Sequence, residues 1–177
     1  MNNLFLTGRI NVGKSTMIKR IIEQLNIRKE EIGGFYTRPY IIDNQVKEFY
    51  IEPLNFNCKS TNIRDRMIGY TSDGIKRIGN TATFENIGVE ILDNCIKNDF
   101  KLIIMDELGF FENTAYQFQR KVHETLDNKK VIGVIKPLSI PFLDSIRERK
   151  DVVEVEVTKD NRENVYRRLA KELMCRY

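Results

Sequence analysis

Short apolar runs alternate along the chain with stretches in which apolar residues recur at helical spacing. The first run, residues 3–7, ends at Gly8, and from Ser15 to Leu25 the apolar side chains fall on one helical face. This pattern predicts a strand, a loop and a helix in that order. The same argument predicts further strands at 101–109, 131–135 and 152–157, and further helices at 84–96, at 115–126, after Pro141, and over the last turns up to Leu173.

Residues 35–52, FYTRPYIIDNQVKEFYIE, predict a β-hairpin. Two β-rich runs flank Asp43-Asn44, which are residue types that favour tight turns, and Gly33-Gly34 marks a break before the first run. Pro39 has no backbone N–H to donate, so we expect it at a sheet edge or a bulge. The segment 57–82 has glycines but no sustained period, and it predicts either a second hairpin or a mobile flap.

Repeated alternation of near-continuous apolar strands with helices indicates a parallel sheet covered on both faces. The sequence therefore predicts a three-layer α/β fold with a mainly parallel sheet and a β-hairpin insertion after the first helix. With 177 residues, 41% of them hydrophobic, the chain has enough apolar side chains for one core, so we expect a single domain over 1–177. Asp160 and Glu163 resemble a capping box before the last helix.

Charge and cysteine content narrow the possible chemistry. The chain carries 29 Lys and Arg against 25 Asp and Glu, and this excess of +4 suits an anionic ligand but is too small to indicate nucleic acid. Cys58, Cys95 and Cys175 are scattered, and His123 is the only histidine, so we expect neither a zinc site nor disulfides. With no secretion signal and no long apolar stretch, we expect a cytoplasmic protein without a membrane segment.

Residues 8–15, GRINVGKS, match G-x-x-x-x-G-K-[ST] at every required position. The match lies between a predicted strand and a predicted helix, where glycines let the backbone curl around phosphate oxygens and the helix N-terminus attracts the same anion. Lys14 would reach the β- and γ-phosphates, and Ser15 would bind Mg²⁺. We therefore expect a P-loop NTPase fold in which the nucleotide contacts Gly8, Arg9, Ile10, Asn11, Val12, Gly13, Lys14, Ser15 and Thr16.

The strand LIIMDELG, residues 102–109, ends in acids. Asp106 comes at the carboxyl end of this buried strand, where ligands bind in open α/β sheets. Its carboxylate can hold Mg²⁺ opposite Ser15. An apolar strand that ends in such an acid is a Walker B pattern. Glu107 follows and can orient a water for attack on the γ-phosphoryl group. Glu107 and Lys14 are the predicted catalytic residues, and hydrolysis of the NTP is the leading reaction.

Residues 106–109 also match the D-x-x-G element of switch GTPases. That class needs an N-K-x-D-type element to bind guanine, and DNKK at 127–130 and TKDN at 158–161 have the wrong order. A guanine-specific switch is therefore not expected.

The chain resembles the THEP1-like P-loop nucleoside-triphosphatases along its whole length. The resemblance rests on GRINVGKST, GGFYTR, MDELGFFE, VIGVIKP and VTKDNREN, which follow one another in the family's order. It implies NTP hydrolysis with broad base tolerance, and it implies a second nucleotide-site segment made of Leu102, Ile103, Ile104, Met105, Asp106, Glu107, Leu108 and Gly109. The chain departs from the family pattern around Arg38 and at residues 110–112.

Charge on the transferring phosphoryl group calls for a further cation, and an arginine supplied by the chain itself is expected. Arg9, Arg38, Arg66 and Arg77 are the candidates. Lys136 follows the strand 131–135, and we expect the base near that loop, which makes Lys136 a candidate for base contact.

We therefore expect an enzyme that converts an NTP (ATP, GTP or another) and water to an NDP and phosphate, with Mg²⁺ held by Ser15 and Asp106. We expect it to be a monomer with no nucleic-acid or membrane partner. Two alternatives remain open. One is a kinase that transfers the γ-phosphoryl group to a nucleotide, a polynucleotide or a small metabolite, with residues 60–80 as its lid, and the other is a nucleotide-dependent binding module.

Overall fold

The fold is built on strands that are apolar on both faces. The computed structural model describes residues 3–56, 62–72 and 76–174. In chain order the elements are β1 (Asn3–Thr7), α1 (Lys14–Gln24), the short helix η1 (Lys29–Glu31), β2 (Ile32–Ile42), β3 (Gln45–Leu54), the short helix η2 (Ile63–Arg66), β4 (Met67–Ser72), β5 (Lys76–Gly79), α2 (Thr81–Thr83), the wider helical turn η3 (Phe84–Gly88), α3 (Val89–Lys97), β6 (Leu102–Leu108), α4 (Tyr116–Asn128), β7 (Val131–Ile135), α5 (Pro141–Arg147), β8 (Val152–Glu156) and α6 (Arg162–Met174). The strands and helices predicted from the apolar pattern are confirmed.

The strands form one eight-stranded sheet in the order β5-β4-β3-β2-β6-β7-β1-β8. From β2 to β8 all neighbours are parallel, whereas β2, β3, β4 and β5 pair antiparallel. The β2–β3 hairpin turns at Asp43 and Asn44, whose φ angles of 50° and 58° fit the tight hairpin turn that these residue types favour. In the described part of 57–82, β4 and β5 form the second hairpin, so this alternative was the right one.

Gly33 and Gly34 do not break the chain, as the sequence suggested, but lie inside β2. A Cβ on Gly34 would lie 1.9 Å from the carbonyl oxygen of Ile104, so the glycine is needed for close approach to β6. The predicted hairpin is thus continuous with the central sheet. Pro39 lies beyond Tyr36, the last residue of β2 that pairs with β6, and beside a register shift, so it occupies an open edge next to a bulge as expected.

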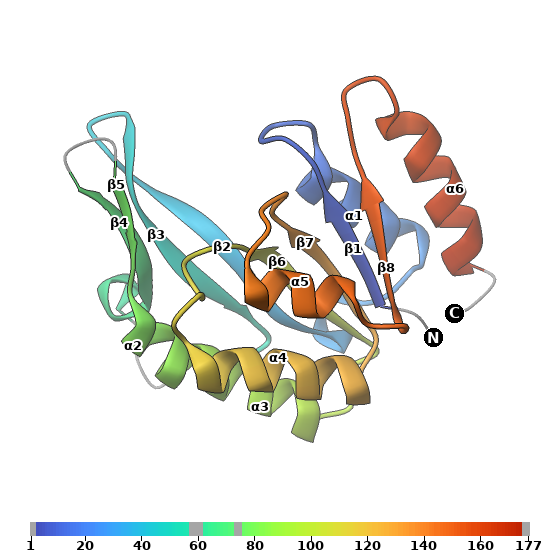
Figure 1. Cartoon of the computed structure of the whole chain (residues 1–177). Helices are drawn as coiled ribbons and strands as arrows, with labels where there is room; N and C mark the ends of the chain where they lie inside the picture. Colours follow the sequence, from blue (N-terminus) through green and yellow to red (C-terminus); the bar gives the residue numbers. More distant parts are fainter. Residues whose placement is uncertain (1–2, 57–61, 73–75, 175–177) are drawn as a thin grey trace.

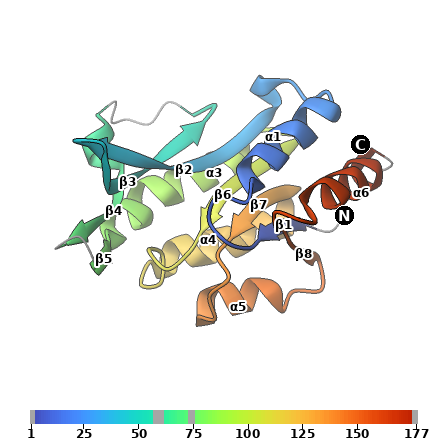
Figure 2. The same ribbon diagram turned by 90° about the horizontal axis from the view of Figure 1, so that it is seen from above.

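Helices cover both faces of the parallel strands (Figures 1 and 2). On β1, Phe5 packs with the cluster that includes α3, α4 and α5, whereas Leu4 and Leu6 pack with α1 and α6. The strand is therefore buried on both sides, as its unbroken apolar sequence requires. The paired strands β4 and β5 lie at the far edge from α6 (Figure 1). Within the described residues, no helix is both long enough and apolar enough to cross a membrane.

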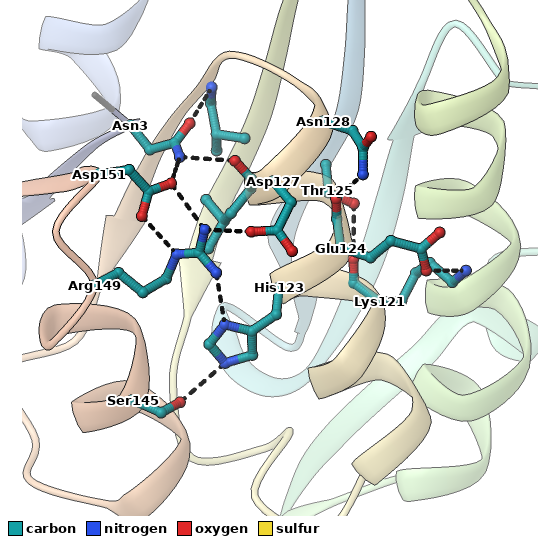
Figure 3. A network of polar contacts seen from close by, with 12 residues as sticks. Asn3, Lys121, His123, Glu124, Thr125, Asp127, Asn128, Ser145, Arg149 and Asp151 are labelled. Atoms are coloured by element: carbon teal, nitrogen blue, oxygen red, sulfur yellow. Dashed lines mark hydrogen bonds and ion pairs between the residues drawn. The ribbon is translucent and has the colours of Figure 1, made fainter. Parts of the chain in front are cut away.

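A polar network ties the amino end of β1 to α4 and to the turn before β8 (Figure 3). The buried Asn3 amide donates to Leu126 O at 3.1 Å and to Asp151 at 3.0 Å, and Arg149 donates to Asp151 and to Asp127. His123 lies beside Arg149 in this network, with Nδ1 at 3.4 Å from its guanidinium. This network lies at the opposite end of β1 from the glycine-rich loop.

The start of α6 differs from the prediction. The helix begins at Arg162, and the reciprocal hydrogen bonds before it join Thr158 and Asn161: the Asn161 side chain accepts from the Thr158 N–H at 2.8 Å, and the Thr158 hydroxyl accepts from the Asn161 N–H at 3.1 Å. Glu163 does not close a capping box, because its carboxylate binds Arg20 of α1 instead.

Candidate functional site

The loop between β1 and α1 curls because three of its residues adopt positive φ angles. These angles are 126° at Gly8, 62° at Asn11 and 98° at Gly13. A Cβ on Gly8 would lie 2.3 Å from the carbonyl oxygen of Val157, so only glycine fits against the segment after β8. Gly13 precedes α1, and no side chain caps that helix end. The first N–H groups of α1 therefore have no intrahelical acceptor, an arrangement that binds anions.

Lys14 folds back across this loop. Its Nζ donates to the carbonyl oxygens of Gly8 and Arg9, both at 2.8 Å, and the residue is buried. Burial lowers the pKa of Lys14, and the nearby carboxylates of Glu107 and Asp106 oppose this shift. The ammonium group is therefore held between the loop and the two acids of β6.

Asp106 faces the same loop from β6. The sheet register places it level with Val134 of β7, which in turn is level with Leu6 of β1. The Asp106 carboxylate accepts a hydrogen bond from the Ser15 hydroxyl. Burial raises the pKa of Asp106, and the Ser15 hydrogen bond opposes that shift. The two side chains thus present oxygen atoms to one point, and oxygen is the ligand type that Mg²⁺ prefers.

Glu107 is paired with a lysine that the sequence had suggested for another role. Its Oε1 lies 3.0 Å from Lys136 Nζ, and the two side chains are 28% and 16% exposed. The backbone N–H of Lys136 donates to Leu108 O at 2.9 Å, which anchors the residue after β7 to the end of β6. Lys136 therefore lies beside the acid and not at a base-contacting position, because the β6–β7 pairing brings the two strand ends together.

Glu112 is a functional candidate that the sequence reasoning missed. It is 2% exposed, and its carboxylate accepts the Gly109 N–H at 3.1 Å. Burial raises the pKa of Glu112 to about 7. The Lys136 side chain passes against Gly109, where an added Cβ would lie 3.0 Å from Lys136 Cδ. An acid three residues after a glycine, with Phe110 and Phe111 between them, was the available signal.

An open pocket of about 620 Å³ joins these groups. Thr37, Pro39, Val46 and Phe49 of the β2–β3 hairpin form one wall, and Val134 and Lys136 belong to another. The predicted nucleotide-contacting residues that line it are Ile10, Asn11, Gly13, Lys14, Ser15, Thr16, Asp106 and Glu107. The structure thus brings together residues from the glycine-rich loop and from the end of β6.

Other residues of the predicted set do not face this pocket. Leu102, Ile103, Ile104, Met105 and Leu108 are fully buried in the core, so β6 positions the acids and does not itself offer side chains to a nucleotide. Gly8, Arg9, Val12 and Gly109 are also absent from the pocket lining. Gly8 lies against the Val157 carbonyl group, and Gly109 lies against the Lys136 side chain.

The described side chains of the predicted arginines do not line this pocket. Arg9 lines a separate hollow next to the segment after β8. Arg38 donates to Glu52 at 2.7 Å, and its guanidinium stacks 4.2 Å from the Tyr36 ring centroid. Arg66 is not among the residues that line the phosphate pocket, and the Arg77 side chain lies outside the described side chains. Among the described side chains, Lys14 and Lys136 are therefore the cations of this pocket.

A parallel sheet with a glycine-rich loop after β1 and an acid at the end of a nearby strand defines the class of P-loop nucleotide-binding proteins. A family model described as NTPase matches residues 3–170, and the chain belongs to this family. The chain is similar to the nucleoside-triphosphatase THEP1 of Thermotoga sp. (strain RQ2), with 32% identity over 92% of this chain and 90% of the relative. The resemblance inferred from the sequence is therefore confirmed.

Solved structures show the same architecture. The crystal structure of THEP1 from the hyperthermophile Aquifex aeolicus superposes with a TM-score of 0.69, at 25% identity and over 96% of both chains. The solution structure of a human cancer-related nucleoside triphosphatase gives a TM-score of 0.71 at 24% identity, over 98% of this chain and 97% of the other. Both likenesses confirm the predicted α/β P-loop fold.

Proposed function

We propose that this chain hydrolyses nucleoside triphosphates with Mg²⁺ to nucleoside diphosphate and phosphate, with Glu107 orienting the attacking water. Membership in the NTPase family supports the reaction, and the Thermotoga relative is named a nucleoside-triphosphatase. The observation that carries the residue assignment is the position of Glu107, which follows Asp106 and lines the same pocket as Lys14. A carboxylate at that place can accept a hydrogen bond from water beside the γ-phosphoryl group.

The glycine-rich loop and Lys14 bind the phosphates in this proposal. Lys14 Nζ donates hydrogen bonds to the carbonyl oxygens of Gly8 and Arg9, and phosphate oxygens would offer it stronger, charged acceptors. Ser15 and Asp106 fit Mg²⁺, because they present a hydroxyl and a carboxylate to one point. When bound, the metal would supply positive charge that neutralises the β- and γ-phosphate oxygens.

Lys136 takes the place of the expected arginine. Its ammonium group forms an ion pair with Glu107, and both residues line the phosphate pocket. A γ-phosphate carries more negative charge than one carboxylate and competes for this ammonium group. Once Lys136 has moved to the phosphate, Glu107 is free to accept a hydrogen bond from the attacking water, and Lys136 stabilises charge on the transferring group. Substrate binding thus prepares the carboxylate for its role.

The test is Glu107→Gln, which removes the negative charge and keeps the shape of the side chain. We expect turnover, measured as phosphate release from MgATP, to fall by about 10²- to 10⁴-fold. Affinity for MgADP should stay nearly unchanged, because the diphosphate lacks the group that Glu107 serves. Glu23→Gln, on the exposed face of α1, is the matched control and should retain wild-type turnover. Wild-type turnover in Glu107→Gln would remove this residue from the mechanism.

The kinase alternative makes a different prediction in the same assay. Incubation with labelled ATP and no acceptor releases phosphate if water is the acceptor, whereas a kinase gives labelled product only when its acceptor is added. The described residues of the predicted lid segment 60–80 form η2, β4 and β5, and they do not line the phosphate pocket. Broad base tolerance, a cytoplasmic location, a single domain and a monomeric state remain predictions from the sequence.

A further inference from the structure

A second pocket adjoins the phosphate pocket between α1 and α6. This α1–α6 pocket has a volume of about 270 Å³ and is lined by Gly13, Thr16, Met17, Arg20, Arg162 and Glu163. Gly13 and Thr16 also line the phosphate pocket, so the two spaces meet at the start of α1. Arg162 and Glu163 of α6 line the α1–α6 pocket, whereas Glu107 belongs to the β6 side of the phosphate pocket.

The direction of the phosphate chain follows from the proposed function. Glu107 marks the γ-phosphate end, and Lys14 and Ser15 mark the middle of the bound chain. The nucleoside must therefore leave at the end away from Glu107, which is the Thr16 side of the helix start. That side leads into the α1–α6 pocket, because Thr16 is one of the two residues that both spaces share.

We propose that the nucleoside of the substrate occupies the α1–α6 pocket and that its base stacks on the guanidinium of Arg162. The inference rests on the proposed function and names the part of the substrate that this surface binds. Arg162 Nη1 lies 4.0 Å from the position of a Cβ on Gly13, so the guanidinium lies over the phosphate loop. Its side chain is exposed and makes no hydrogen bond or ion pair with another described residue. A planar guanidinium that is exposed and has no such partner can stack on the face of a base.

The opposite wall of the pocket is held rigid by contacts within the protein. Arg20 binds both carboxylate oxygens of Glu163, each at 3.1 Å, and its guanidinium lies 3.8 Å from the Tyr166 ring centroid. The Tyr166 hydroxyl in turn donates to Gln24 at 2.6 Å. Met17 adds an apolar surface that is almost fully buried. The wall therefore needs little ordering when a ligand binds.

This wall also predicts weak discrimination between bases. Glu163 is the carboxylate of the pocket, and both of its oxygens are already occupied by Arg20. A hydrogen bond from a base would therefore add to a carboxylate whose charge Arg20 already neutralises, which weakens the discrimination between guanine and adenine. Stacking on Arg162 and contact with Met17 depend on the flat face that all bases share. The structure thus assigns a pocket that binds a nucleobase by its shape.

The experiment compares ligands with and without a nucleoside that lack a γ-phosphoryl group. Dissociation constants for MgADP, MgGDP and magnesium pyrophosphate are measured by calorimetry on the wild type and on Arg162→Ala. Arg162→Ala should weaken MgADP and MgGDP alike, by roughly three- to tenfold, and leave pyrophosphate within about twofold. Arg168→Ala, an exposed arginine further along α6 that does not line the pocket, is the matched control and should change none of the three.

Each other outcome has a distinct meaning. Equal weakening of all three ligands places Arg162 on the phosphates and overturns the inference, and so does an unchanged affinity for both nucleotides. If the wild-type dissociation constants for MgADP and MgGDP differ by more than about 100-fold, the predicted weak discrimination between bases is wrong. A wild-type protein that binds pyrophosphate as tightly as MgADP contradicts the nucleoside pocket alone, whereas one that binds none of the ligands contradicts the proposed function and the pocket together.

Discussion

Glu112→Gln should change the pH dependence of folding stability. Glu112 is 2% exposed and lies in the loop after β6, with its carboxylate bonded to the Gly109 N–H. Glutamine has nearly the same shape, and its amide oxygen can accept the same hydrogen bond. The substitution therefore removes the ionisable proton and leaves the packing in place, which isolates the effect of burying a titratable carboxyl group.

The magnitude follows from the pKa difference between the folded and the unfolded chain. Burial raises the Glu112 pKa from 4.5 to about 7, so between these values the folded protein binds a proton that the unfolded chain releases. The folded state therefore loses stability as the pH rises through this window and is penalised fully above about pH 7. One pKa unit corresponds to about 1.4 kcal/mol, so the total effect is on the order of 3 kcal/mol.

Urea unfolding followed by circular dichroism at pH 5 and pH 8, without nucleotide or metal, measures this effect. The free energy of unfolding of Glu112→Gln, relative to the wild type, should rise by about 2.5 kcal/mol between the two pH values, because the unfolded chain is already partly ionised at pH 5. The matched control is Glu23→Gln on the exposed face of α1. Its free energy of unfolding should differ from that of the wild type by the same small amount at both pH values. The chain has no tryptophan, which makes circular dichroism the more direct probe.

Two results would refute this reasoning. If the free energies of unfolding of Glu112→Gln and the wild type differ by the same amount at pH 5 and pH 8, the carboxyl group titrates alike in the folded and the unfolded chain. A wild type that gains stability relative to the variant at high pH would mean that the ionised carboxylate is favoured by the fold, with the charge of Lys136 outweighing the cost of burial.

Three further predictions concern the cation of the site, the sheet and the polar network. Lys136→Met should lower the turnover number for MgATP by about 100-fold, and Lys136→Arg should restore part of it because it retains the charge. Gly34→Ala should destabilise the protein by more than about 3 kcal/mol in urea unfolding, because its Cβ would lie 1.9 Å from Ile104 O. Burial and the charge of Arg149 lower the pKa of His123, so wild-type stability should fall relative to His123→Gln as the pH drops below about 6.5 in thermal unfolding.

The amino-acid sequence by itself determined the elements and the phosphate-binding loop. Apolar runs predicted the strands, because the interior of a strand buried on both faces is apolar, and β1, β6 and β7 follow this rule with their polar residues confined to the strand ends. Residues 8–15 could be assigned because the chemistry of the loop depends on neighbours in the chain. Asp106 was accessible to the same reasoning, since a buried strand directly precedes it and ends at the edge where ligands bind.

Tertiary structure alone decided which side chains complete the site. Lys136 reaches Glu107 because β6 and β7 pair in parallel. Arg162 lies over the phosphate loop because α6 packs beside α1. Neither contact can be predicted from the spacing of residues along the chain. Gly33 and Gly34 misled the sequence interpretation for a related reason. Glycine permits both a turn and the close approach of two backbones, and only the position of Ile104 on the neighbouring strand distinguishes the two uses.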